Sequence, residues 1–87
     1  MQVAVELFGI PRASAGVAET SASGENLGDI LADLARKLPQ LGVTCIDGRS
    51  LRPGFVVNLS GQKFVTSPDT PIRPDDTILL LSLDAGG

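Results

Sequence analysis

A single amphipathic stripe constrains the fold of this chain more than any other feature. Between residues 27 and 38, apolar side chains recur at helical spacing, at Leu27, Ile30, Leu31, Leu34, Ala35 and Leu38. Asn26 precedes the stripe as a good N-cap and Pro39 bars its continuation, so the pattern predicts one helix between them. No second stretch shows this spacing. Because the apolar helix face must be covered, we expect the helix to lie on a β-sheet.

The remaining apolar segments alternate or form short runs that are typical of strands. Residues 2–8 alternate, which predicts a strand with Val3, Val5 and Leu7 buried. The last strand, with its run Ile78–Leu81, is expected to be buried and central. Turns or irregular connections are expected at 9–16 and over most of 40–54. Further strands are expected at 17–21, 43–46 (a short edge strand), 55–60, 63–66 and 77–83.

This order of elements predicts an α+β domain with a mixed sheet of four to five strands and one main helix across one face. The 87 residues suffice for one small domain. We expect the folded domain to span residues 1–83 and residues 84–87 to form a flexible tail. Alternation alone leaves open whether Phe8, Phe64 and Leu81 belong to the core or to an interface, although Phe8 shares its face with Glu6, which favours exposure.

Composition argues against several classes of function. The net charge of −3 and the scattered cations speak against nucleic-acid binding. The chain has no histidine, so the commonest general base and metal ligand is missing, and no metal site is expected. Cys45 is the only cysteine and is expected to be a buried, inert thiol. No apolar run is long enough to span a bilayer, and no signal peptide is expected, so the predicted location is the cytoplasm.

The sequence ends in Leu83-Asp84-Ala85-Gly86-Gly87. Glycine costs more backbone entropy than any other residue, so a terminal pair is not expected to serve stability. Without Cβ atoms, these residues could enter a narrow channel and present a carboxylate to another protein's active site. The alternative is an ordinary frayed terminus.

Several segments together resemble a known family. They are Asp47-Gly48-Arg49, Val57-Asn58 and the stretch 70–78, and the terminal Gly86-Gly87 adds to the resemblance. Nearly the whole chain resembles the small β-grasp, ubiquitin-like sulfur carriers, namely the small subunit of molybdopterin synthase and the carrier of the thiazole pathway. The length favours the molybdopterin branch. In the stretch 70–78, Asp75 stands where the family prefers glycine.

The resemblance implies a role for the tail. An E1-like enzyme would adenylate the carboxylate of Gly87 with ATP, and a sulfur donor would convert it to a thiocarboxylate, with Gly86 leaving access to it. An accepting synthase, such as the large subunit of molybdopterin synthase, would receive the sulfur. The chain itself would bind no cofactor and would not be an enzyme. The same resemblance assigns partner binding to Phe8, Phe64, Leu81 and Leu83.

Two alternatives stay open at the level of sequence. A ubiquitin-like modifier would use the same activated Gly87 to form bonds with protein lysines. A non-covalent β-grasp interaction module would leave its terminal glycines unreacted. The sequence barely separates the carrier from the modifier.

Overall fold

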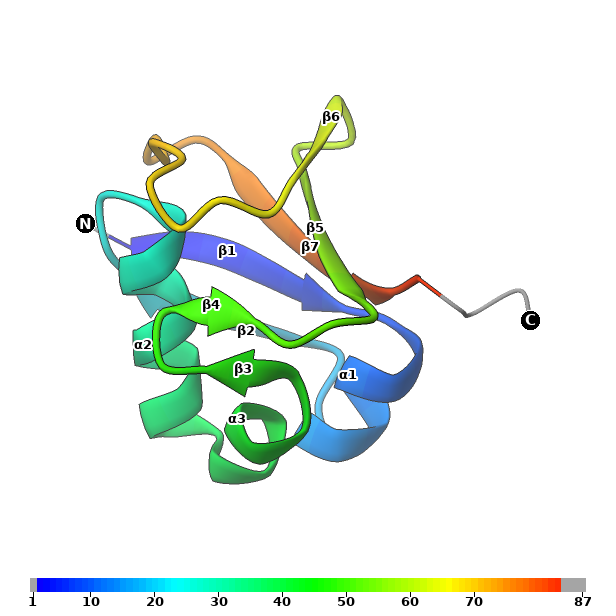
Figure 1. Ribbon diagram of the computed structural model, residues 1–87. Coiled ribbons are helices and arrows are strands. Elements are labelled where there is room, and N and C mark those ends of the chain that lie inside the picture. Colours follow the sequence, from blue (N-terminus) through cyan, green and yellow to red (C-terminus); the bar gives the residue numbers. More distant parts are fainter. Residues whose placement is uncertain (1, 84–87) are drawn as a thin grey trace.

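The computed structural model describes residues 2–83 and shows a mixed sheet with helices on one of its faces (Figure 1). The five strands of this sheet lie in the order β2-β1-β7-β5-β6. Their bounds are β1 Gln2–Leu7, β2 Glu19–Ser23, β5 Phe55–Leu59, β6 Lys63–Val65 and β7 Thr77–Ser82. The predicted α+β class and mixed sheet are therefore confirmed.

Strand β7 occupies the middle of the sheet, as its apolar run predicted. It pairs in parallel with β1 and antiparallel with β5, and its register joins Val5 to Ile78 and Val57 to Leu80. The two outer strand pairs, β1–β2 and β5–β6, are antiparallel and flank it. A central strand is covered on both edges, so the end of β7 is held firmly by its neighbours.

The helix expected at residues 27–38 is α2, Leu27–Lys37, and the N-cap is confirmed because Asn26 Oδ1 accepts a hydrogen bond of 2.8 Å from the Asp29 N–H. The core lies between α2 and the inward residues of the sheet. It contains Val3, Val5, Leu7, Leu27, Ile30, Leu31, Leu34, Val57, Leu59, Ile78 and Leu80. None of the helices between residues 2 and 83 has the length and apolar content needed to cross a bilayer.

The expectation of a turn at 9–16 is wrong. Residues Gly9–Ala15 form the short helix α1, which ends at Gly16 with a positive φ of 79°. Pro11 fits here because it lies in the first turn, where backbone N–H groups lack intrahelical partners. The Pro11 side chain is buried, so tertiary packing stabilises this helix. The segment is too short to show a periodic apolar pattern in the sequence.

The expectation of mostly irregular chain from residue 40 onward, with an edge strand at 43–46, is also wrong. Pro39 ends α2 as predicted, but it also begins the helix α3, Pro39–Cys45, at the position where proline is tolerated. Leu41 and Cys45 are four residues apart and both buried, whereas Val43 faces solvent. The pattern of α3 is helical but too short to separate from a strand by sequence.

Smaller differences concern strand limits. Strand β2 lies at 19–23 rather than 17–21, because Ala22 is the residue that enters the core. The turn expected at Asp47-Gly48 is present, but it joins two further short strands, β3 Ile46–Asp47 and β4 Ser50–Leu51, in a separate two-stranded sheet.

Candidate functional site

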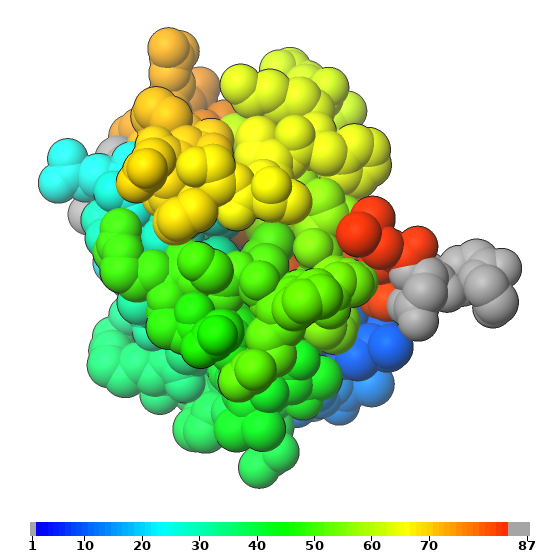
Figure 2. Space-filling view, in the orientation of Figure 1, coloured from blue at the N-terminus to red at the C-terminus, as the bar shows by residue number. Residues whose placement is uncertain are grey.

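The sheet face opposite the helices carries an apolar hollow of about 260 Å³ at the end of β7. We call its five apolar side chains the outer patch, and they are Phe8, Val56, Phe64, Leu81 and Leu83. Figure 2 shows the red end of the described chain at the surface of the molecule. Leu83, the last described residue, is one of the patch residues. The patch therefore borders the point where the described chain ends.

Strand alternation places these side chains outside the core. In β7, Ile78 and Leu80 face the helices and are buried, so Leu81 points to the opposite face. Val56 is the cross-strand partner of Leu81. Phe8 follows β1, and its N–H donates a hydrogen bond of 3.1 Å to the carbonyl of Leu80, which fixes its position beside β7.

Much of this apolar surface is open. Phe8 is 40% exposed, Phe64 65% and Leu83 66%, whereas Val56 is only 6% exposed because its neighbours cover it. Exposed aromatic and aliphatic side chains that gather around one hollow are typical of a surface that contacts another molecule. Scattered exposed residues such as Val43 carry no such meaning.

The structure brings together the four residues that were assigned to partner binding, namely Phe8, Phe64, Leu81 and Leu83. Sequence reasoning did not single out Val56. Its signal is its place next to Val57 in an apolar strand, but two adjacent valines do not reveal which one faces out. Gly86 and Gly87, and the predicted tail 84–87, lie outside the described residues.

The Asp47-Gly48-Arg49 motif makes a structural contact in this chain, through the side chain of Arg49. Arg49 Nη1 donates a 2.6 Å hydrogen bond to Asp29 Oδ1, and its Nη2 donates one of 3.2 Å to Asn26 Oδ1. The Arg49 guanidinium thereby lowers the pKa of the Asp29 carboxyl below its usual value. The motif fastens the β3–β4 turn to the start of α2.

The stretch 70–78 also holds the fold together. The Thr70 carbonyl accepts a 2.9 Å hydrogen bond from the Leu27 N–H. The carboxylate of Asp76 accepts hydrogen bonds from the Arg73 N–H and the Ser60 hydroxyl, at 2.8 and 3.1 Å. Asp76 therefore closes its own turn and is tied to the β5–β6 hairpin.

Cys45 is buried as expected, and burial raises the pKa of its thiol above the ordinary value. A raised pKa lowers the thiolate fraction and so the reactivity of a cysteine. Within residues 2–83 there is no cluster of three or more potential metal-ligating cysteine, aspartate or glutamate side chains.

Comparisons with known proteins bear on the fold. No protein-family model and no curated protein sequence matched the chain. Among solved structures, small archaeal modifier protein 1 from Methanosarcina acetivorans is 28% identical, with a TM-score of 0.77 over 99% of this chain and 96% of that chain.

Two further structures are more distant in sequence. Small archaeal modifier protein 1 from Haloferax volcanii is 20% identical, with a TM-score of 0.81 over 100% of both chains. A chain of the BexX/CysO complex from Amycolatopsis orientalis is 20% identical, with a TM-score of 0.80 over 98% of this chain and 99% of that one. This chain therefore has the ubiquitin-like β-grasp fold.

Proposed function

We propose that this protein is a sulfur carrier whose Gly87 carboxylate is activated by an E1-like adenylating enzyme and converted to a thiocarboxylate. The observation that carries the proposal is the outer patch, which lies on the sheet face at the end of β7, a few residues before Gly87. A partner that covers this patch would be placed next to the emerging tail. Structural similarity to a chain of a CysO complex and to a small archaeal modifier protein also supports a carrier or modifier role.

The chemistry requires a good leaving group on a poor electrophile. A carboxylate oxygen of Gly87 attacks the α-phosphorus of ATP and pyrophosphate leaves, which gives an acyl-adenylate. A sulfur nucleophile then attacks the carbonyl carbon and AMP leaves, so a carbon–sulfur bond replaces the anhydride bond. Gly86 and Gly87 have no Cβ, so they obstruct neither attack.

The outer patch supplies binding free energy away from the reacting carbon. Burying Phe64, Leu81 and Leu83 under a partner removes apolar surface from water, at about 25 cal/mol per Å². That energy orients the tail in the partner's site, where position strongly affects rate. We propose that the sulfur is delivered in molybdopterin synthesis, with the large subunit of the synthase as acceptor.

A second function is favoured by a specific observation. The solved structure with 28% identity is named a small archaeal modifier protein. An activated Gly87 attacked by a lysine amine instead of sulfur would form an isopeptide bond and release AMP. The two functions share the outer patch and the activated carboxylate, so they differ only in the nucleophile.

Pyrophosphate exchange with the cognate activating enzyme tests the proposal. The intact chain should support ATP–pyrophosphate exchange, whereas deletion of Gly87 should abolish it, because the carboxylate withdraws by up to ~3.5 Å. Adding one alanine after Gly87 should also abolish it, because the reactive carboxylate becomes an amide. Full exchange by either variant would contradict the proposal.

The mass of the protein from its native host separates the functions. Replacement of one oxygen by sulfur supports the carrier, and conjugates of higher mass support the modifier. If neither is found and exchange fails as well, a non-covalent module remains.

A further inference from the structure

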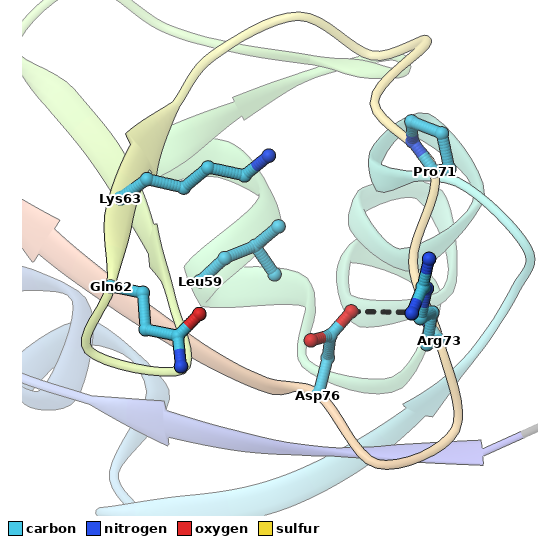
Figure 3. A pocket seen from close by; sticks show the side chains of 6 residues that line it. All are labelled: Leu59, Gln62, Lys63, Pro71, Arg73 and Asp76. Carbon is cyan, nitrogen blue, oxygen red and sulfur yellow. Dashed lines mark hydrogen bonds between the residues drawn. The ribbon is translucent and has the colours of Figure 1, made fainter.

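A second cleft of about 290 Å³ lies on the other side of β6 from the outer patch. Figure 3 shows it between the β5–β6 hairpin and the segment 71–76, with Lys63 extending from one wall and Arg73 standing on the other. Its lining residues are Leu59, Gln62, Lys63, Pro71, Arg73 and Asp76. None of these side chains was assigned a functional role from the sequence.

The cleft brings together two cations whose charges are not neutralised by ion pairs within residues 2–83. Arg36 and Lys37 pair with Asp33, and Arg49 pairs with Asp29. Neither Lys63 nor Arg73 has such a partner in the described part of the chain, although the protein as a whole is acidic. With Asp76 as the one carboxylate among the described residues that line the cleft, the two cations leave it a net positive charge, which favours a negatively charged group.

The carboxylate of Asp76, the acidic residue of the cleft, is already hydrogen-bonded within the protein. One oxygen of the Asp76 carboxylate accepts from the Ser60 hydroxyl, and the other accepts from the backbone N–H of Arg73. Ser60 Oγ in turn accepts from the Thr77 N–H at 3.1 Å. These bonds fix Asp76 in the turn and leave the side chains of Lys63 and Arg73 available to an incoming ligand.

The apolar part of the cleft lining selects among anions. Leu59 and Pro71 form apolar parts of its lining, which suit the methylene carbons of a glutamate side chain. Inorganic phosphate carries no carbon atoms that could pack against Leu59 and Pro71. The cleft therefore fits one carboxylate on a short aliphatic stem.

The sheet edge beside the cleft is the one that is open to a partner. At the opposite edge, the N–H of Ser23 donates to Asp33 Oδ2 at 2.8 Å, and Lys37 Nζ donates to the Ser21 carbonyl at 3.1 Å, so side chains of α2 cover β2. Within residues 2–83, strand β6 pairs with β5 alone. Open strand edges invite pairing with another chain.

We propose that this cleft binds a glutamate or aspartate side chain in an acidic segment of the protein that also covers the outer patch. Lys63 and Phe64 are adjacent in β6, with Cα atoms ~3.8 Å apart and side chains on opposite faces. A segment that passes around the β6 edge therefore reaches both sites. The identity of the partner rests on the function proposed above, whereas the preference for a carboxylate rests on the cleft alone.

The preference is tested first without any partner enzyme. Amide NMR spectra of the full chain are recorded with a short peptide, blocked at both ends, that carries glutamates between leucines. We expect shifts confined to residues 59–65 and 71–76, and affinity about 5-fold weaker or lost for the matching glutamine peptide. The double variant Lys63→Ala/Arg73→Ala should lose the shifts. Arg36→Ala removes a cation from the exposed side of α2 and should keep them.

Three results would overturn the assignment: equal binding of the glutamine peptide, shifts elsewhere only, or tighter binding of inorganic phosphate than of the glutamate peptide. Either single variant, Lys63→Ala or Arg73→Ala, serves if the double variant does not fold.

A second measurement uses the cognate activating enzyme. The double variant should bind it about 3- to 10-fold more weakly, mainly through a slower association rate, and the salt dependence of that rate should flatten. Arg36→Ala should bind like the unchanged chain. Unchanged binding by the double variant would refute the partner contact. If the enzyme does not recognise the unchanged chain at all, the proposed function fails, while the peptide titration still decides what the cleft binds.

Discussion

At the scale of single residues, position in the strand decides whether a leucine is buried in the core or lies on the outer face of the sheet. Leu80 and Leu81 are neighbours in β7, yet Leu80 is fully buried among the core residues and Leu81 lines the outer patch. The cause is the period of two in a strand, which sends successive side chains to opposite faces. Hydrophobicity alone would place both leucines in the core.

Asp33 ties β2 to α2 and should make stability depend on pH. Its pKa is lowered, first because the Ser23 N–H donates to its carboxylate and further because Arg36 and Lys37 bond to it. A lowered native pKa means that the ionised group stabilises the fold above the unfolded pKa of about 3.9, and that this contribution is lost as the pH falls through the native value.

The variant Asp33→Asn should therefore unfold at lower urea concentration than the parent chain at about pH 7, and the difference should shrink below about pH 4. Urea unfolding at several pH values measures it. Asp69→Asn is the control, because the Asp69 carboxylate is exposed and makes no ion pair within residues 2–83. A difference between Asp33→Asn and its parent that does not change with pH would show that charge is not the cause.

Cys45 is a packing residue, so Cys45→Ala should lower the free energy of unfolding by about 1 kcal/mol, which is typical for the loss of one buried heavy atom. The Gly87 carboxylate of this variant should be converted to a thiocarboxylate at the same rate as in the parent chain, when equal amounts of folded protein are compared. Denaturant unfolding and the mass of the product give the two readings. Slower conversion at equal folded concentration would assign a chemical role to the thiol.

At the scale of elements, the pair α2–α3 shows how packing creates structure that local pattern conceals. Gly42 of α3 lies against Ala35 of α2, so that a Cβ added at Gly42 would be 2.9 Å from the Cβ and 3.1 Å from the Cα of Ala35. The two helices approach closely because both residues are small. Leu41 and Cys45 then enter the core beside α2.

Gly42→Ala should destabilise the protein by about 1–3 kcal/mol, because the overpacked contact outweighs the gain in helix propensity of about 1 kcal/mol. Chemical denaturation measures this change. Val43→Ala is the matched control in the same helix, since Val43 is 70% exposed, and it should alter stability little. A stabilised Gly42→Ala variant would mean that α3 can move away from α2 at no cost.

At the scale of the whole molecule, the two faces of the sheet carry different side chains. One face carries the helices and the core, and the other carries the outer patch at the end of β7. Further along the same face the side chains turn polar, at Glu6 and Thr77. A partner would thus be directed towards the end of the sheet from which the chain continues to Gly87.

Leu81→Glu should leave the fold close to normal and weaken binding to the cognate activating enzyme more than about 10-fold, because a charge would be desolvated in an apolar contact. Circular dichroism and binding titration are the measurements. Thr77→Glu adds the same charge on the same strand and face, but outside the patch, and should bind normally. An unfolded Leu81→Glu variant would place Leu81 in the core, and normal binding would exclude the patch.

The sequence by itself determined the elements whose pattern repeats locally. The stripe of α2 and the alternation of β1 and β7 extend over enough residues to distinguish a helix from a strand. The family resemblance singled out Phe8, Phe64, Leu81 and Leu83, of which the alternation alone had left the first three undecided between core and surface. The di-glycine end is likewise a matter of sequence, and its role stays a prediction.

Only the tertiary structure decided the rest. Helices α1 and α3 have seven residues each, too few to be stable or recognisable alone, and they form because Pro11, Leu41 and Cys45 are buried against the remainder of the chain. The outward position of Val56 depended on its pairing with Leu81. The cationic cleft needed two segments distant in sequence to meet. Long-range pairing fixes such features, and no local pattern encodes it.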